Sequence, residues 1–490
     1  MKTIKSLRIK YKSVPVQVRA SFWFLICSFL QKGISTITTP IFTRILSTSE
    51  YGQFGVWNSW YGIIVIVVAL GMTGGVHAQG LVKYEKDRAV FSSSLQGLAT
   101  ALVFIWSILY ISFDSFWNSL FSLTTVQMLA MLVIIWATTV FGLWANEQRV
   151  TYSYRKLVIV TLIVSVAKPA VGILFVLNST DKVTARVLGL MLVELISYSW
   201  MFIIQIRRGK TFFNLKYWKY ALCFNIPLVP HYLSMTVLNS ADRIMIKNMV
   251  GDSQAGIYNL AYSLSAIMVL FNTALSQTIG PWMYQKIKYK KVKDIAPIAY
   301  ITLIIIAAVN LMLILLAPEA VRIFAPQEYY EAIWVIPPVA MSVYFMYAYD
   351  LFAKFAFYYE KTKVIMLASV LGALLNVVLN YIFIKQFGYI AAGYTTLVCF
   401  MVFSITHYIF MRKVCCDCCN GEYPYDTRKI IFITVPFLIA GFLFMATYNY
   451  PVIRYGLVGA AVIVAIIMRK KIIAVVKKIM NIKEEKRVNS

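Results

Sequence analysis

Charged side chains are scarce in this sequence of 490 residues. Asp, Glu, Lys and Arg together make up 14% of the chain, whereas hydrophobic residues make up 60%. Soluble proteins carry about 25% charged residues, which help to cover the surface that faces water. The composition therefore excludes a soluble globular protein and favours a body that lies in lipid.

Acidic residues are the scarcest charged type, with 20 Asp and Glu against 47 Lys and Arg and a net charge of +27. A strongly basic chain can indicate a nucleic-acid partner. Here, however, the basic residues stand in short clusters between long apolar runs. That distribution is typical of membrane proteins, in which it reports orientation. We therefore expect membrane lipids as partners and no nucleic acid.

Motifs for nucleotide or metal chemistry are missing. The sequence contains no Walker A motif, no Gly-rich dinucleotide motif after a strand and no HExxH pair. The connections between the apolar runs are too short to hold a catalytic domain. We therefore expect a protein that is not an enzyme, without catalytic residues or a cofactor. The missing ATPase motif indicates a secondary transporter, or a flippase driven by a gradient or by removal of its product.

Four of the seven cysteines lie close together, between Cys415 and Cys419, and the other three lie inside apolar runs. Four thiols can bind zinc, but zinc sites usually separate two pairs of ligands along the chain. The compressed cluster favours reduced cytosolic thiols instead. We predict no metal site.

Long apolar runs fill most of the chain. A helix that crosses a bilayer needs about 20 mostly apolar residues, at a rise of about 1.5 Å each. The first run follows a basic N-terminus and is too long for a cleavable signal, which indicates a retained span. The sequence predicts an all-α integral membrane protein with about fourteen spans, at residues 20–43, 55–79, 93–113, 125–145, 157–178, 184–206, 220–244, 255–281, 296–316, 332–352, 363–384, 389–411, 430–448 and 451–468.

Basic residues between the spans test this assignment. With the N-terminus in the cytoplasm, about 37 of the 47 Lys and Arg fall in cytoplasmic segments and about 7 in outer segments. One missed or extra helix would exchange the sides of all later loops and remove this asymmetry. The distribution predicts a multi-pass protein of the cell inner (plasma) membrane with both termini in the cytoplasm.

The first and seventh spans are followed by similar segments. Residues 49–54 and 253–258 align at an offset of 204 residues, with Ser, Gly and a closing aromatic in register. Because this offset covers six spans, the two copies have the same topology in the membrane. The repeat predicts two six-helix lobes, residues 1–212 and 213–413, and a third segment, residues 414–490, with two further helices and a basic cytoplasmic tail.

Polar residues of the first span recur every three or four positions and so share one face. They are Ser28, Lys32, Ser35, Thr36, Thr39 and Thr43. The same register in the seventh span holds Tyr232, Thr236, Asn239, Ser240, Arg243 and Lys247. Small polar residues can simply pack helices together, which suits the Ser and Thr but not a lysine. We expect both faces to border a wet cleft between the lobes.

Three charges are predicted to lie near the middle of the bilayer: Lys32, Lys168 and Glu194. An unpaired charge at that depth is costly. Lys168 and Glu194 lie on neighbouring spans, where they either form a structural ion pair or include a carboxylate that exchanges protons during transport. Lys32 has no evident partner and is the first candidate to contact an anionic group of a substrate.

Other candidate residues lie on the first and seventh spans. Arg44 and Arg243 are near the outer ends, where they either contact phosphate or sugar acids or extend to the interface. Asn239 shares the polar face with Arg243 and is also a candidate for substrate binding. Pro227 and Pro230 interrupt the helical hydrogen bonds of the seventh span and are candidate hinges.

Two motifs occupy the ends of these spans. The first comprises Gln31-Lys32-Gly33, Thr39-Pro40, Thr43-Arg44 and Glu50-Tyr51-Gly52, and the second comprises Asn225-Ile226-Pro227, Ala241-Asp242-Arg243 and Gly256-Ile257-Tyr258. Both resemble patterns of the polysaccharide-exporter branch of the multidrug/oligosaccharidyl-lipid/polysaccharide flippase superfamily, especially its Wzx-type O-antigen and capsule flippases.

The resemblance implies a flippase with two lobes that open their cleft alternately to each face of the membrane. Its cargo is expected to be an undecaprenyl-diphosphate-linked oligosaccharide repeat unit, moved from the cytoplasmic to the periplasmic leaflet for lipopolysaccharide or capsule biosynthesis. Charged cleft residues are expected to contact the diphosphate and the sugar. A polysaccharide polymerase and a chain-length regulator are candidate partners.

Several alternatives stay open. A multidrug antiporter of the same superfamily typically handles organic cations, for which carboxylates rather than Lys32 and Arg243 are expected in the cleft. A lipid II flippase has the same number of spans. An O-antigen polymerase or membrane glycosyltransferase belongs to a different class and is expected to carry a large outer loop with catalytic groups. A scaffold without transport activity is a further class, for which a deep charged cleft is a costly feature.

Overall fold

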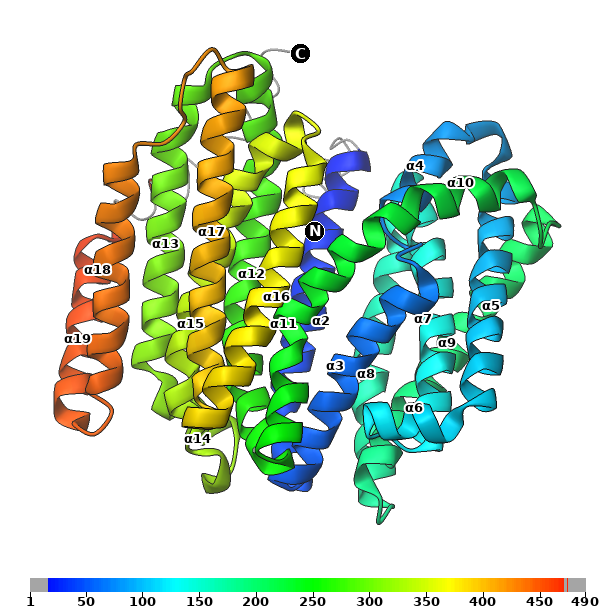
Figure 1. Ribbon diagram of the computed structural model, residues 1–490, viewed down its shortest axis with the longest axis horizontal. Helices are drawn as coiled ribbons and strands as arrows, with labels where there is room; N and C mark the ends of the chain where they lie inside the picture. The colour runs from blue at the N-terminus through cyan, green and yellow to red at the C-terminus, as the bar shows by residue number, and fades with distance from the viewer. Residues whose placement is uncertain (1–15, 471–473, 475–490) are drawn as a thin grey trace, which may run out of the picture. The chain divides into compact units, whose positions relative to one another are not determined.

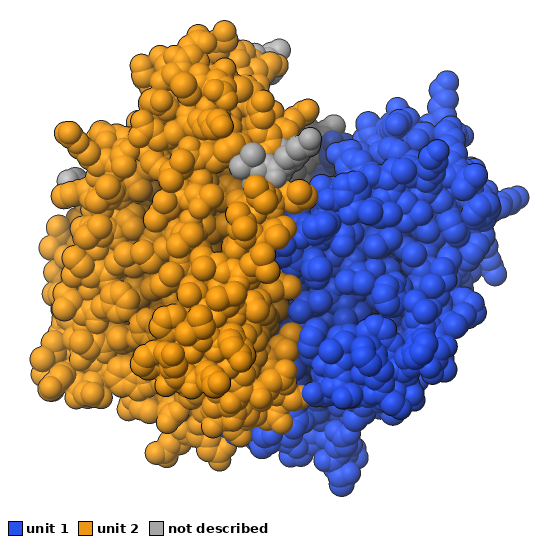
Figure 2. Space-filling view, viewed as in Figure 1, with its two compact units in different colours: residues 1–236 blue, residues 237–490 orange. Residues whose placement is uncertain are grey.

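The computed structural model describes residues 16–470 and residue 474, and these residues form helices and no strands. Contacts divide the chain into two compact units, Met1–Thr236 (unit 1) and Val237–Ser490 (unit 2), which are coloured separately in Figure 2. The lobe boundary predicted after residue 212 stays a prediction. The basic N-terminus and most of the predicted basic cytoplasmic tail lie outside the described residues.

Unit 1 is centred on α7, the most buried of its candidate spans. This helix packs against α9, which also packs against α8 and α5, while α8 lies along α2. In Figure 1 these elements run from dark blue to green. They are α2 (Val16–Ile45), α3 (Thr48–Ala69), α4 (Gly75–Lys83), η1 (Glu85–Asp87), α5 (Arg88–Ser112), α6 (Asp114–Phe121), α7 (Thr125–Val150), α8 (Tyr154–Leu177), α9 (Lys182–Gly209), α10 (Leu215–Asn225) and η2 (Ile226–Leu228).

Unit 2 is centred on α15, whose apolar side chains are almost all buried. This helix packs against α17, α12 and α13, and α18 covers α13 and α15. The elements, green to red in Figure 1, begin with α11, which crosses the boundary between the units. They are α11 (Val229–Met249), α12 (Asp252–Lys288), η3 (Val292–Ile295), α13 (Ala296–Leu315), α14 (Ala317–Phe324), η4 (Gln327–Tyr329), α15 (Ala332–Tyr358), α16 (Thr362–Phe387), α17 (Ala391–Cys418), α18 (Thr427–Ala446) and α19 (Pro451–Ile467).

Twelve helical segments of the described chain are long and apolar enough to cross a membrane. Two more helices match the remaining predicted spans: α2, with 30 residues, and α19, which contains the shorter apolar stretch Pro451–Val464. The predicted class, an all-α multi-pass membrane protein, is confirmed.

The predicted span 55–79 is in fact two helices. Helix α3 ends at Ala69, Leu70 and Gly71 have positive φ values of 50° and 65°, and α4 begins at Gly75. Glycine adopts this left-handed conformation without a steric penalty, which allows the chain to turn here. The second copy of the repeat has no glycine at the corresponding positions, 275 and 278–279, and there α12 continues unbroken for 37 residues.

Proline breaks a helix in the second copy of the repeat at a position where the first copy is continuous. Pro227 and Pro230 fall where α10 ends, a single 3-10 turn follows and α11 begins. A proline removes one helical hydrogen bond and its ring clashes with the preceding turn. The first copy has Trp23 and Ile26 at these positions, and α2 is continuous there. The hinge role of the two prolines stays a prediction.

Two short helices extend the internal duplication beyond the predicted motifs. Helices α6 and α14 have eight residues each and lie at an offset of 203 residues, directly after α5 and α13. The sequence had indicated only loops there, because each segment is too short to show a clear helical period. Their matching positions confirm the duplication.

His77 lies on α4, outside the spanning helices, and its ring stacks on Phe91. Burial lowers the pKa of His77 to about 3, against about 6.5 in an unfolded chain. Because the folded pKa is the lower one, stability is complete above pH about 6.5 and is lost as the pH falls towards about 3. Between pH 7.5 and 5.5 we expect the native protein to lose about 1.4 kcal/mol more unfolding free energy than His77→Gln. Denaturant titrations at both pH values, followed by tryptophan fluorescence, measure this difference, and equal losses contradict it.

Candidate functional site

The hydroxyl groups on the polar face of α2 bond to the backbone of the same helix. Ser28 Oγ donates to the Phe24 carbonyl at 2.9 Å, and Thr39 Oγ1 donates to the Ser35 carbonyl at 3.2 Å. Such bonds satisfy a hydroxyl without a partner on another helix. These hydroxyl groups therefore need no partner from another helix, from water or from a substrate.

Lys32 differs from its neighbours on this face. Its side chain is exposed, and it forms no hydrogen bond or ion pair within the described part of the chain. It lies 16 residues after the start of α2 and 13 before its end, or about 24 Å and about 20 Å from the two ends along the helix axis. An ammonium group at this depth is costly unless water or an anion compensates it.

The end of α2 is fixed to the start of α3 by a capping box. Ser47 accepts a hydrogen bond from the Glu50 backbone N–H, and the Glu50 carboxylate accepts one from the Ser47 N–H at 2.7 Å. Lys182 donates to the last carbonyl of α2, Ile45, at 3.0 Å, and the Arg44 guanidinium donates to the Pro40 carbonyl at 2.8 Å. Arg44 is nevertheless exposed, so its role in substrate binding stays a prediction.

Arg186 lies between two aromatic rings beside this turn. Its guanidinium carbon is 3.6 Å from the ring centres of both Phe42, on α2, and Phe54, on α3. Planar guanidinium groups stack on aromatic faces, and the attraction grows when water is excluded. The contact joins α9 to α2 and α3, and no pattern in the sequence indicated a role for this arginine.

Replacing Arg186 with Lys is expected to lower the free energy of unfolding by about 1–2 kcal/mol, because a compact ammonium cannot stack on both rings. Arg207→Lys, a change at an exposed residue of the same helix, is the control and is expected to have no effect. Denaturant unfolding of the purified variants measures the difference, and equal stabilities would show that the stacking contributes nothing.

The predicted ion pair between α8 and α9 is present. Lys168 Nζ contacts Glu194 Oε1, and the two side chains are 29% and 6% exposed. The other carboxylate oxygen, Oε2, is buried without a hydrogen-bond partner among the described residues. Breaking a buried pair by removing one charge typically costs about 3–5 kcal/mol. The pair therefore holds α8 to α9, and whether Glu194 also exchanges protons stays a prediction.

A second buried carboxylate, Asp242 on α11, is fully enclosed in unit 2. Its Oδ1 accepts a hydrogen bond from Asn380 Nδ2 at 2.6 Å, and its Oδ2 accepts from Tyr258 OH at 2.7 Å and Thr396 Oγ1 at 2.9 Å. Asn380 in turn accepts from Thr395 and donates to Asn376. A buried charge needs such bonds to offset lost hydration. The network ties α11 to α12, α16 and α17.

Arg243, the neighbour of Asp242, is held by the same unit. Its guanidinium donates to the Asn239 carbonyl and lies 4.2 Å from the ring centre of Tyr262, whose hydroxyl donates to Asn239 Oδ1 at 3.2 Å. Arg243 is only 8% exposed. Both predicted binding residues of the seventh span, Asn239 and Arg243, are thus brought together, and substrate binding by them stays a prediction.

In the sequence, Asp242 and Tyr258 stand out only as parts of motifs, and Asn376 and Asn380 share one face of the predicted span 363–384. Their spacing carried a usable signal, because Asn376 and Asn380 recur at i and i+4 inside an apolar helix. Polar residues at such depth usually bond to one another across helices. Which helices meet there was not evident from the sequence.

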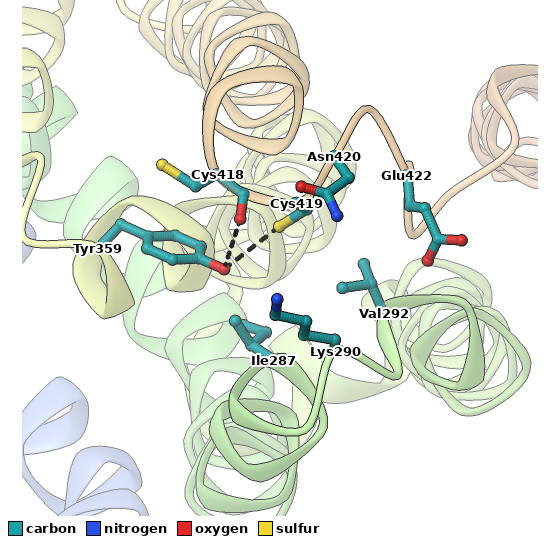
Figure 3. A pocket seen from close by; sticks show the side chains of 8 residues that line it. All are labelled: Ile287, Lys290, Val292, Tyr359, Cys418, Cys419, Asn420 and Glu422. Atoms are coloured by element: carbon teal, nitrogen blue, oxygen red, sulfur yellow. Dashed lines mark hydrogen bonds between the residues drawn. The ribbon is translucent and has the colours of Figure 1, made fainter.

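The cysteine cluster lies at the end of α17, beside a pocket of about 280 Å³ (Figure 3). The hydroxyl of Tyr359 lies 3.4 Å from both Cys419 Sγ and the Cys418 carbonyl oxygen, and Lys290 also lines the pocket. Within the described ranges, no group of three or more His, Cys, Asp or Glu side chains could hold a metal ion.

Comparison with known proteins gives the family. The model of the family described as polysaccharide biosynthesis protein matches residues 18–287, which is more than half of the chain. The chain belongs to this family. The MatE model matches residues 227–382, and the two matches together place the chain in the multidrug/oligosaccharidyl-lipid/polysaccharide flippase superfamily.

The individual proteins that resemble this chain do so at low sequence identity. A Haemophilus influenzae protein described as an uncharacterized membrane protein is 21% identical over 373 residues, covering 73% of this chain and 88% of the relative. Among solved structures, the lipid II flippase MurJ in an inward closed conformation has a TM-score of 0.65 at 13% identity, covering 87% of this chain and 98% of the other. An inward-facing multidrug resistance transporter of the MATE family has a TM-score of 0.60 at 14% identity, covering 79% and 95%. These structures show a shared fold.

Proposed function

We propose that this protein is a flippase for an undecaprenyl-diphosphate-linked oligosaccharide repeat unit in surface polysaccharide biosynthesis. It moves the unit from the cytoplasmic to the periplasmic leaflet of the inner membrane by alternating access, with both termini in the cytoplasm. Its family, described as polysaccharide biosynthesis protein, supports the glycan part of the cargo. The protein performs no covalent chemistry on that cargo.

One contrast between charged side chains carries the proposal. The mid-span cation Lys32 is exposed and unengaged among the described residues. The deep carboxylates Glu194 and Asp242 are buried and bound by side chains of their own units. A transporter of organic cations needs accessible carboxylates, whereas a diphosphate needs an accessible cation. The arrangement favours an anionic cargo over a cationic drug.

Deletion of the gene in its native host tests the proposal. We expect complete lipid-linked repeat units to accumulate on the inner leaflet of the inner membrane while surface glycan is lost. Repeat units that reach the periplasmic side and stay unpolymerised would move the assignment to an O-antigen polymerase. Normal surface glycan would refute the proposal and point to other cargo, with lipid II or organic cations tested next.

A further inference from the structure

The start of α8 forms one wall of a groove of about 330 Å³ in unit 1. Three basic side chains line it: Arg19 comes from α2, while Arg155 and Lys156 come from the first turn of α8. The rest of the lining is uncharged and consists of Val16, Tyr152, Ser153 and Tyr154. Helices α2 and α8 pack along each other, so two segments more than 130 residues apart supply the charges.

The positions of Arg155 and Lys156 are unfavourable for the isolated helix. Both lie in the first turn of α8, where the backbone N–H groups point outwards and the helix dipole is positive. The residue before the helix, Ser153, makes no capping hydrogen bond. Cations normally stabilise the other end of a helix. The groove therefore concentrates positive charge from three side chains and from the backbone.

The two basic residues of α8 in this groove are not neutralised by a described carboxylate. Arg155 and Lys156 form no ion pair or hydrogen bond with any described residue. Glu147, near the end of α7, is already bound by Arg208 and by Gln205 Nε2 at 2.8 Å. An anion from outside the protein would relieve the repulsion and bond to the free helix end.

The position of the groove along the spans indicates what kind of anion it meets. It lies where α2 and α8 begin, and the ends of spans lie at the depth of the lipid headgroups. Tyr152 is 42% exposed beside it, and exposed tyrosines are common at this depth. We infer that this groove is a binding site for the phosphate headgroup of an anionic membrane lipid.

Two kinds of lipid carry this chemistry, a phospholipid phosphodiester and a polyprenyl diphosphate. The site is separate from Lys32, and its existence does not depend on the proposed cargo. Clusters of basic residues at a membrane surface attract anionic lipids even without a shaped site. The experiment must therefore separate the groove from the general positive charge of this end of unit 1.

Native mass spectrometry of the full-length detergent-solubilised protein provides the test, with phosphatidylglycerol, undecaprenyl diphosphate and phosphatidylcholine as separate probes. We expect at least one anionic lipid to bind more tightly than phosphatidylcholine. The double variant Arg155→Gln/Lys156→Gln is expected to weaken that binding by about ten- to thirty-fold. The matched control Lys86→Gln/Lys210→Gln removes two exposed charges outside the groove and is expected to change it by less than about two-fold.

The outcomes decide both the site and its lipid. Stronger binding of phosphatidylglycerol identifies a phospholipid site, and stronger binding of undecaprenyl diphosphate identifies a site for the carrier lipid. Equal losses in the two double variants, or no preference for anionic lipid in the native protein, would overturn the inference. If the groove variant does not fold, the single variants Arg155→Gln and Lys156→Gln give the same comparison at about five-fold each.

Discussion

Replacing Lys32 with Gln is expected to reduce export of the lipid-linked glycan by at least about ten-fold, which corresponds to one lost charge-assisted contact with the cargo. Lys32 is the exposed mid-span cation of α2, and none of the described residues bonds to it. Because the side chain is exposed, the variant is expected to fold with native stability. Lys32→Arg keeps the positive charge and is expected to retain most of the activity.

Complementation of a gene-deletion strain measures this effect as the ratio of surface glycan to glycan held on the inner leaflet. Lys385→Gln provides the control, because it removes an exposed lysine from the last turn of α16 that belongs to neither of the two predicted cleft faces. Native export by Lys32→Gln at native expression would show that Lys32 does not contact the cargo. It would leave the polysaccharide family assignment unchanged.

Reversing one charge of the Lys168–Glu194 pair is expected to abolish both folding and export. Lys168→Glu places two carboxylates together at mid-span, and Glu194→Lys places two ammonium groups there. Each change costs at least about 3–5 kcal/mol, because it leaves buried charge without compensation. The exchanged double variant, Lys168→Glu/Glu194→Lys, restores the pair and is expected to recover the folded protein. Membrane yield and thermal unfolding of all three variants measure this recovery.

Export by the exchanged variant then separates the two roles of Glu194. A folded and active double variant supports a structural pair, since the carboxylate has moved to the other helix. A folded but inactive one shows that position 194 itself needs a carboxylate, as proton exchange requires. Failure of the double variant to fold contradicts the account that the mutual attraction of these charges holds α8 to α9.

The two copies of the repeat use one aligned position for different contacts. Phe54 in the first copy stacks on Arg186 of α9, whereas Tyr258 in the second copy donates its hydroxyl to Asp242 of α11. Both residues are aromatic, and each lies two positions after the aligned glycine of its copy. The alignment therefore identifies the shared position correctly. It does not identify the partner, because Arg186 and Asp242 come from different elements of the two units.

The sequence by itself determined the class, the spans and the duplication. Long apolar runs can be satisfied only as helices in lipid, and proline acts locally, so the interruption at Pro227 follows from single residues. The break after Ala69 was not predicted, because the apolar run continues past the turn at Leu70 and Gly71. Only the tertiary structure decided which deep charges are engaged. Lys32 and Asp242 are both charges inside predicted spans, yet Lys32 is exposed and Asp242 is bonded to residues of three other helices. The physical reason is that pairing depends on the rotation and contact of helices far apart in the chain, and no local pattern of residues records these.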